Sequence, residues 1–311
     1  MQLPDKIYGN TAQKEALSRA VMQDTLCHAY LFYGEEGIGK KTLALWFARM
    51  ILCRHPGENG GCGVCHACVE FLQDTHPDLY VAPYDKPLPV AAVREIRSRC
   101  FVKPNEGRYN VIVIPQADRM ESASFNALLK VLEEPPGNTV FLLTAADKSS
   151  TPPTITSRCI PVMLSLLPQD ELRVALHERS NAEESLIEQA ISYADGNLGK
   201  ALSMLEDESY GKAVQTASAM YEALCRRKEY AFLSLCQTQI ADKAQFGRVN
   251  EILLQRLRQE LLTGGKISGL KQQTLLSMLA FCRETALRLR KPYSMQLLTA
   301  GYTAGIFAQI E

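Results

Sequence analysis

Seven residues near the amino terminus, Gly34 to Lys40, have the glycine and lysine spacing of a phosphate-binding P-loop. An apolar run at 29–33 precedes them and residues at helical spacing follow, which is the strand, loop and helix order that the motif requires. Backbone N–H groups of such a loop surround phosphate oxygens, and the lysine reaches the terminal phosphates. A glycine-rich turn that binds nothing is the alternative. The residues predicted to contact a nucleotide are Gly34, Gly37, Gly39, Lys40, Lys41 and Thr42.

The residues that would hold Mg²⁺ and activate water are replaced. Lys41 stands where a Ser or Thr hydroxyl normally binds Mg²⁺, and Thr42 follows one position late. A later apolar run, 111–114, ends in Pro115-Gln116, where P-loop ATPases carry an Asp-Glu pair. Asp118 is expected to cap the helix that follows. We therefore expect bound ATP to stay unhydrolysed, while the sequence leaves open whether any nucleotide, ATP or ADP, occupies the loop.

Four cysteines lie in a short segment rich in turn-forming residues: Cys53, Cys62, Cys65 and Cys68. Two-residue spacers let a tight turn offer neighbouring sulfurs to one ion, and zinc favours four thiolates in a tetrahedron at about 2.3 Å. A redox Cys-x-x-Cys pair is the alternative, but four cysteines in one polar insertion favour a metal. His55 and His66 are available as substitute ligands, although four thiolates complete the set. The sequence therefore predicts a zinc site formed by these four cysteines.

The composition fits a protein with more than one packed core, since 46% of the 311 residues are hydrophobic. Its 34 basic and 34 acidic residues balance, so the net charge does not indicate a nucleic-acid partner. We find no charged-then-apolar leader and no run of about 18 apolar residues, so a cytoplasmic protein without a membrane partner is expected. The other cysteines are expected to be buried as small apolar residues: Cys27, Cys100, Cys159, Cys225, Cys236 and Cys282.

Apolar runs alternate with helical patterns in the first 165 residues and predict strands at 29–33, 79–82, 111–114, 139–145 and 160–164. This alternation predicts an α/β domain with a mostly parallel sheet covered on both faces. We predict three domains: 1–165 with the zinc insertion at 53–68, a small helical domain at 166–208, and an all-helical domain at 209–311.

The last domain shows helical spacing only. Leu253, Leu257 and Leu261 mark one buried helix face. A second buried face is expected at Leu276, Met278, Leu279, Phe281 and Leu287. Breaks are expected at Gly264-Gly265 and before Pro292.

Two further segments make the pattern specific. Ser124 to Pro136 reads Ser-Phe-Asn-Ala-Leu-Leu-Lys-Val-Leu-Glu-Glu-Pro-Pro and is expected to form a helix ending at its glutamates; the other segment is Thr156-Ser-Arg-Cys159. With the P-loop and the four-cysteine insertion, they closely resemble bacterial clamp-loader AAA+ subunits of DNA polymerase III. The resemblance covers the whole chain and is weakest in the last hundred or so residues. It implies a P-loop AAA+ domain, a small helical lid domain and a helical collar domain that joins subunits.

Within that family, the departures favour one kind of subunit. An ATP-hydrolysing gamma/tau-type subunit would carry the Asp-Glu pair, a Thr at position 41 and a sensor arginine after a Gly-x-Leu turn. This chain has Pro115-Gln116, Lys41 and the turn Gly196-Asn-Leu-Gly-Lys200. The pattern resembles the delta prime type, which does not hydrolyse ATP; the gamma/tau type is the alternative. A stand-alone P-loop enzyme or a thiol oxidoreductase would need a local base or a lone reactive cysteine pair, and neither is apparent.

The same resemblance implies a role in trans for Arg158, at the start of the last strand. A guanidinium there would stabilise charge on the phosphate transferred in a neighbouring subunit. A surface ion pair is the alternative for a lone arginine. The implied partners are gamma/tau-type and delta-type subunits in a five-subunit ring, which places a sliding clamp on primed DNA.

Overall fold

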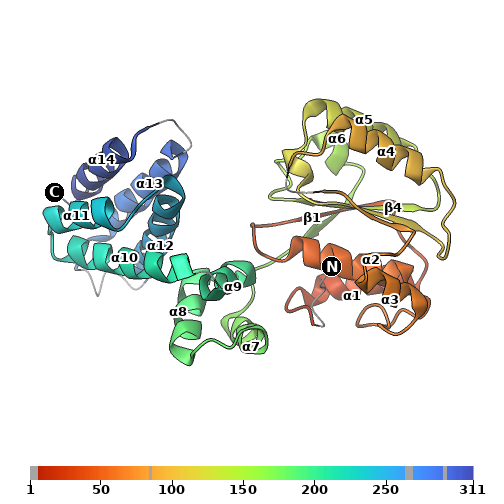
Figure 1. The fold of residues 1–311 in the computed structure, drawn as a ribbon, viewed down its shortest axis with the longest axis horizontal. Helices are drawn as coiled ribbons and strands as arrows, with labels where there is room; N and C mark the ends of the chain where they lie inside the picture. The colour runs from red at the N-terminus through yellow and green to blue at the C-terminus, as the bar shows by residue number, and fades with distance from the viewer. Residues whose placement is uncertain (1–5, 84–85, 207, 263–268, 290–292, 311) are drawn as a thin grey trace. The chain divides into compact units, whose positions relative to one another are not determined.

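The computed structural model describes residues 6–83, 86–206, 208–262, 269–289 and 293–310. The chain divides into two compact units, Met1–Ala175 with Gly196–Lys200, and Leu176–Asp195 with Ala201–Glu311 (Figure 1). The division into three domains at 165 and 208 stays a prediction. The breaks predicted at Gly264-Gly265 and before Pro292 include positions that lie outside the described residues.

The first unit is built on a five-stranded parallel sheet. Its strands are β1 (Ala29–Tyr33), β2 (Leu79–Val81), β3 (Asn110–Ile114), β4 (Thr139–Ala145) and β5 (Ile160–Met163), in the order β2-β3-β4-β1-β5. Each strand lies within or nearly on an apolar run named from the sequence, so the α/β parallel-sheet prediction is confirmed. In register, Leu31 of β1 lies between Leu143 of β4 and Pro161 of β5.

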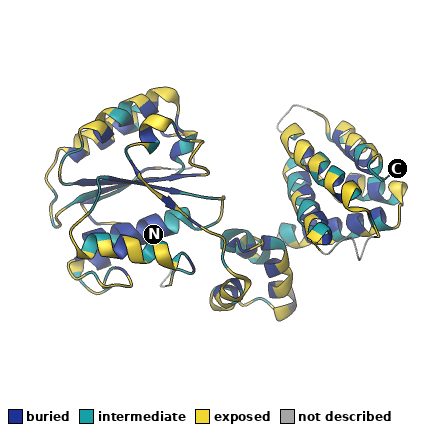
Figure 2. Ribbon diagram, turned by 180° about the vertical axis from the view of Figure 1, so that it is seen from behind, coloured by how far each residue is buried: buried dark blue, intermediate teal, exposed yellow. Residues whose placement is uncertain are grey.

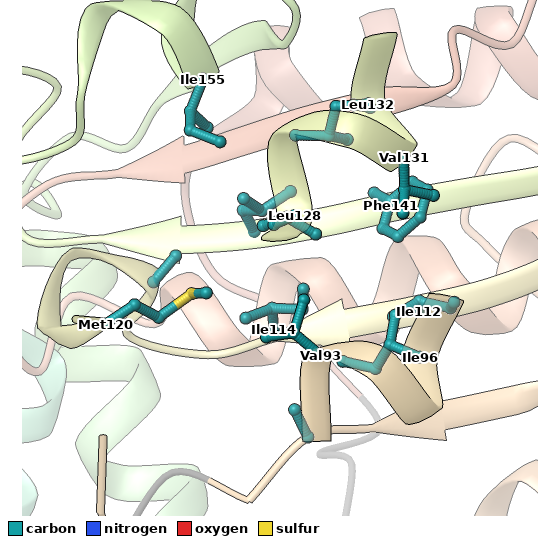
Figure 3. Packing of buried hydrophobic residues seen from close by; sticks show 14 of the residues in the cluster. Val93, Ile96, Ile112, Ile114, Met120, Leu128, Val131, Leu132, Phe141 and Ile155 are labelled. Atoms are coloured by element: carbon teal, nitrogen blue, oxygen red, sulfur yellow. The ribbon is translucent and has the colours of Figure 1, made fainter. Parts of the chain in front are cut away.

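Helices cover both faces of this sheet (Figure 1). One face carries α1 (Thr11–Met22), α2 (Lys40–Leu52) and α3 (His66–Leu72); the other carries α4 (Val90–Cys100), α5 (Ser122–Glu133) and the short α6 (Pro153–Thr156). Strand side chains alternate between the two cores, so Leu31 packs with the α4 and α5 side while Tyr30 and Phe32 pack with α2. Figure 3 shows Val93 and Ile96 of α4 and Leu128 of α5 beside Ile112, Ile114 and Phe141 of the sheet.

The second unit is helical. It contains α8 (Glu184–Ala194), α10 (Glu208–Cys225), α11 (Glu229–Thr238), α12 (Lys243–Leu262), α13 (Gln272–Arg288) and α14 (Met295–Phe307); α7 (Gln169–Arg179) and α9 (Leu198–Glu206) each cross a sequence boundary between the units. Aromatic rings fill its centre, where the rings of Phe246 and Tyr302 lie 5.0 Å apart, edge to face. The outer faces of its helices are exposed (Figure 2).

Two sequence expectations for buried residues need correction. On α13 the buried line is Leu275, Met278, Cys282 and Thr285, at spacings of three and four. Leu276 and Leu287 lie off that line and are 55% and 63% exposed, so their predicted burial is wrong. Among the scattered cysteines, Cys27 and Cys225 are half-buried, whereas the other four are buried as predicted. In the described part of the chain, no helix has the length and apolar character needed to cross a bilayer.

Candidate functional site

The P-loop joins the end of β1 to the start of α2, as the sequence predicted. Gly39 precedes the helix with φ 97°, in the region that favours glycine, and Lys40 is the first helical residue. Beside the loop lies a cavity of about 300 Å³. The P-loop and the start of α2 contribute Gly37, Gly39, Lys40, Lys41 and Thr42 to its lining. The segment after β3 contributes Pro115, Gln116, Asp118 and Arg119. Of the six predicted contact residues, only Gly34 lies outside the lining.

The P-loop lysine is bonded to its own loop. The Lys40 ammonium donates hydrogen bonds to the carbonyl oxygens of Gly34 at 2.6 Å and Glu35 at 2.7 Å. Burial lowers the pKa of Lys40 from its usual value, and the carboxylates of Asp118, Glu36 and Glu35 oppose that shift. A phosphate chain entering the cavity would have to compete with these two carbonyls for the ammonium.

Residues far along the sequence also hold the loop. Asn197 is 1% exposed, and its side-chain amide donates to the Glu36 carbonyl at 2.8 Å while its oxygen accepts from the backbone of Lys200 at 3.2 Å. The Gly199 backbone donates to the Gly37 carbonyl at 3.0 Å. A Cβ on Gly199 would lie 2.4 Å from that oxygen, so the approach requires glycine. The turn where an active subunit would carry a sensor arginine therefore bonds to the loop itself.

The strand end that would supply acids is committed to structural bonds. The Gln116 backbone, at φ 50°, donates to Thr144 Oγ1 at 2.9 Å. Asp118 lies in a short 3-10 helix, Ala117–Arg119, and its Oδ2 accepts from the Ala146 backbone at 3.0 Å. Glu121 occupies the N-cap position of α5, so the expectation that Asp118 caps this helix is wrong. Asp118 instead links this 3-10 helix to Ala146, the residue after β4.

The four cysteines converge as the spacing predicted. Their Sγ atoms all lie within 4.8 Å of one another, and Cys53 Sγ lies 3.8 Å from Cys65 Sγ. A tetrahedron with metal–sulfur bonds of about 2.3 Å has edges of about 3.8 Å, so this donor set fits zinc. Backbone N–H groups of His55 and Cys62 donate to Cys53 Sγ at 3.3 Å and 3.2 Å. These bonds orient the sulfur as the second shell of a metal site does.

The cysteine loop is attached to α1 and α2. The indole N–H of Trp46 on α2 donates to the Asn59 carbonyl at 3.2 Å, and the Ser18 hydroxyl on α1 donates to the Glu58 carbonyl at 3.0 Å. Gly60 has φ 117°, and a Cβ there would meet the Trp46 ring nitrogen at 2.5 Å. Trp46, the single tryptophan, therefore reports directly on the order of this loop.

The metal-free thiols differ in their protonation. Backbone N–H groups of Val64 and Cys65 lower the pKa of the Cys62 thiol to about 6, whereas burial raises the pKa values of Cys53 and Cys68. Cys62 is also the one exposed member of the four. The geometry thus gives a metal ion an open approach at Cys62 and buried ligands behind it.

Arg158 lies in the turn between α6 and β5, two residues before the strand rather than at its start. Its guanidinium donates to Glu133 Oε1 at 2.9 Å and to the Thr154 carbonyl at 2.7 Å. The side chain is 34% exposed. In this conformation Arg158 forms the surface ion pair that the sequence analysis kept as its alternative.

Comparisons with known proteins agree with these motifs. The family described as DNA polymerase III, delta subunit, matches residues 9–168, just over half of the chain. The chain belongs to this DNA polymerase III delta subunit family. The family resemblance inferred from the motifs is therefore confirmed.

Two proteins of similar sequence and one similar structure were found. DNA polymerase III subunit delta' of Pseudomonas aeruginosa is 42% identical over 136 residues, which are 43% of this chain and 42% of that protein. Subunit tau of Bacillus subtilis is 30% identical over 207 residues, 65% of this chain and 37% of that protein. The chain therefore matches less than half the length of either relative. The crystal structure of a gamma subunit-related protein from Thermotoga maritima shares the fold, with a TM-score of 0.55, 15% identity, and coverage of 96% of this chain and all of that chain.

Two residues of this DNA polymerase III family member have structural roles that the sequence did not predict. Asn197 was noted only as part of a turn, yet it holds the P-loop carbonyl of Glu36. Arg119 was not considered, yet it lines the cavity beside Lys40 and Lys41. The pair Gly196-Asn197 is a turn signal. Nothing local in the sequence shows that Asn197 bonds to Glu36, which lies 161 positions away.

Proposed function

We propose that this chain is a delta-prime-like clamp-loader subunit that does not hydrolyse ATP. One observation carries the proposal: a P-loop that keeps its glycines and Lys40 lies beside a strand end with Pro115-Gln116 and with an Asp118 already bonded to backbone. P-loop ATPases need a Ser or Thr and an acid to hold Mg²⁺, and a further group to position the attacking water. Lys41 and Pro115 offer no ligand to Mg²⁺, and Gln116 carries no carboxylate.

We propose that Cys53, Cys62, Cys65 and Cys68 hold one structural zinc ion. The mutual sulfur distances and the N–H donors to Cys53 support this assignment. Bound zinc would cross-link the loop 53–68 and stabilise its fold. The loop in turn covers Trp46 on the helix that carries the P-loop.

We propose that Arg158 completes the ATP site of a neighbouring subunit. The pair with Glu133 is partly exposed, and exposed ion pairs contribute little, about 0–1 kcal/mol. The ion pair with Glu133 therefore resists little when Arg158 turns to a phosphate oxygen, and the bond to the Thr154 carbonyl is exchanged for one to phosphate. Its fork of donors matches phosphate geometry, as an arginine finger requires.

The proposed partners are gamma/tau-type and delta-type subunits in a five-subunit ring, and through that ring the sliding clamp and primed DNA. The family match and the printed names of the relatives support this assignment. Residues 209–311 would join a helical collar, and residues 166–208 would form the lid domain.

The second candidate is an ATP-hydrolysing gamma/tau-type subunit. It is favoured by the extent of the tau match, which covers 65% of this chain against 43% for the delta' match. The replaced residues at 41, 115 and 116 count against it. The two candidates differ in whether the isolated chain turns over ATP.

Reconstitution tests the proposal. Purified chain is mixed with gamma-type and delta-type subunits and analysed by size-exclusion chromatography with mass measurement, and steady-state ATP hydrolysis is measured on the chain alone. We expect a stoichiometric complex and no turnover by the chain alone. Turnover that disappears in Lys40→Ala would establish the gamma/tau-type candidate, and failure to assemble would remove the clamp-loader role.

A further inference from the structure

We propose that the P-loop cavity binds the phosphate chain of a nucleoside di- or triphosphate without Mg²⁺, with the Lys41 ammonium in the place of the metal. The inference rests on the proposed non-hydrolysing function, because a site that performs no phosphoryl transfer does not need the metal for chemistry. It assigns a ligand state to the cavity and a specific role to Lys41.

The cavity has the charge for such a ligand. Three cationic side chains line it, Lys40, Lys41 and Arg119, against two carboxylates, Glu36 and Asp118. Arg119 pairs with Glu36 at 3.9 Å, with side chains 56% and 83% exposed, so this pair offers little resistance to rearrangement. The Asp118 carboxylate already accepts the Ala146 N–H. The lining therefore has one more positive than negative side chain.

The two positions from which P-loop ATPases hold Mg²⁺ carry no metal ligand in this cavity, and its two carboxylates already have partners: Glu36 pairs with Arg119, and Asp118 accepts the Ala146 N–H. That ion prefers hard oxygen ligands in octahedral geometry and is held through one or two carboxylates together with phosphates. Along the described lining, the position next to Lys40 is an ammonium, and Gln116 stands where an acid would lie. An ammonium repels Mg²⁺ but binds phosphate oxygens as a compact point charge. The Lys41 ammonium would therefore contact the phosphate oxygens directly, where an active ATPase contacts them through Mg²⁺.

The neighbouring groups show what binding would change. Lys40 donates to the Gly34 and Glu35 carbonyls, so a phosphate chain takes over an ammonium that already has hydrogen bonds. The carbonyls of Glu36 and Gly37 are held by Asn197 and Gly199. The loop is thus fixed before the ligand arrives, which lowers the ordering cost of binding.

The test uses the intact protein and ADP labelled on its ribose with a methylanthraniloyl fluorophore. Titrations run in excess EDTA and in Mg²⁺, on wild type, Lys41→Thr, Lys41→Arg and Lys130→Thr. Lys130→Thr removes one exposed charge from α5, away from the cavity lining, and is the matched control. Far-ultraviolet circular dichroism and Trp46 fluorescence check that each variant is folded.

We expect wild-type Kd values in EDTA and in Mg²⁺ to agree within about threefold, whereas a metal-held phosphate chain would lose far more. Lys41→Thr should weaken binding in EDTA by roughly ten- to a hundredfold, the range for losing a hydrogen bond to a charged group. Lys41→Arg and Lys130→Thr should stay close to wild type. Inorganic tripolyphosphate should displace the labelled ADP, because the phosphate chain is what the cavity recognises.

Several results would overturn the inference. They are the absence of saturable binding in EDTA, equal affinity of wild type and Lys41→Thr in EDTA, and displacement by adenosine but not by tripolyphosphate. ATP hydrolysis measured on the same samples separates the two proposals. ATP hydrolysis in Mg²⁺ would contradict the proposed non-hydrolysing function. The titration in EDTA tests metal-free binding independently of that result.

Discussion

The two candidate ion-binding regions of this molecule lie at opposite ends of one helix and differ in their donor sets. Lys40 begins α2 at the P-loop, and Cys53 occupies its C-cap position in the cysteine cluster. The cluster has its complete donor set converging on one point. The P-loop region keeps its cradle while its metal ligands are replaced. A helix of 13 residues, about 20 Å long, thus joins the P-loop, whose expected metal ligands are replaced, to the cysteine cluster, which has four thiols.

The difference follows from how each region is assembled. All four cysteines come from 16 consecutive residues, Cys53 to Cys68, so local turns alone bring them together. The P-loop cavity is lined by the loop, the end of β3 and the end of β4, and the turn at Asn197 holds the loop. Replacing one contributor there removes the chemistry and leaves the sheet intact. Catalytic loss in such a site is compatible with an unchanged fold.

The largest expected effect is at the cysteine cluster. Wild type should carry about one zinc per chain, and Cys62→Ser should lose it, because structural zinc contributes on the order of 10 kcal/mol to local folding. Trp46 is bonded to the cysteine loop, so its emission should shift to the red as the loop opens. The sheet should persist, since its two cores do not depend on the loop. Elemental analysis and fluorescence measure both quantities.

Cys27→Ser is the matched control, since Cys27 is half-buried and outside the cluster. It should retain zinc and wild-type emission. Wild-type protein prepared without chelator that contains no zinc, with all four thiols freely titratable, would contradict the metal assignment and with it the contrast between the two regions.

The next largest effect concerns the proposed action of Arg158 on the ATP site of a neighbouring subunit. We propose that the chain hydrolyses no ATP itself, so any contribution to hydrolysis in the ring would come from another surface, and Arg158 is the proposed group. Arginine fingers in GTPases are worth roughly 10³–10⁵ in rate, so Arg158→Ala should clearly slow hydrolysis at the neighbouring site of the assembled ring. Single-site turnover is the sharper measurement, because other subunits presenting arginines would dilute the bulk rate.

Arg108→Ala serves as the control for Arg158→Ala. Arg108 also forms an exposed ion pair, with Asp24 at 3.4 Å. Both variants should fold, bind zinc and assemble, since neither side chain is buried. Equal hydrolysis by the two reconstituted complexes would show that Arg158 is only a surface cation paired with Glu133.

The same contrast explains what the sequence could predict. The strands could be predicted because five apolar runs are bounded by turns. The cysteine cluster could be predicted because its four members lie close together in the sequence. The bond from Asn197 to Glu36 could not be inferred, since it depends on where a distant turn packs. Asp118 was misassigned because a capping residue and a strand-linking residue look alike in sequence. On α13, Leu276 is apolar but one position off the buried line, which periodicity with several leucines does not resolve.

A smaller effect is expected where the turn meets the P-loop. Gly199→Ala places a Cβ 2.4 Å from the Gly37 carbonyl oxygen, which belongs to backbone and cannot swing away as a flexible side chain could. We expect a loss of roughly 1–3 kcal/mol in the free energy of unfolding of the sheet unit, typical of overpacking. Urea unfolding followed by Trp46 emission reports on this unit. Gly137→Ala, where an added Cβ meets nothing within 4 Å, should change little. Equal stabilities for the two variants would show that the turn and the loop are not in close contact.

The smallest effect is expected from restoring the lost acids. Pro115→Asp with Gln116→Glu returns the Asp-Glu pair to the end of β3, yet we expect no ATP turnover above background. Lys41 still places an ammonium where the metal hydroxyl belongs, and the turn at 196–200 still lacks a sensor arginine. Adding Lys41→Thr to this double variant should introduce Mg²⁺-dependent nucleotide binding without turnover, because a metal ligand alone does not position the attacking water. A steady-state ATPase assay on each variant, with Lys40→Ala added as the control for a contaminating ATPase, makes the comparison. Turnover in the double variant that disappears with Lys40→Ala would mean that only two residues separate this region from an active site, and that the contrast with the intact cysteine cluster is shallow.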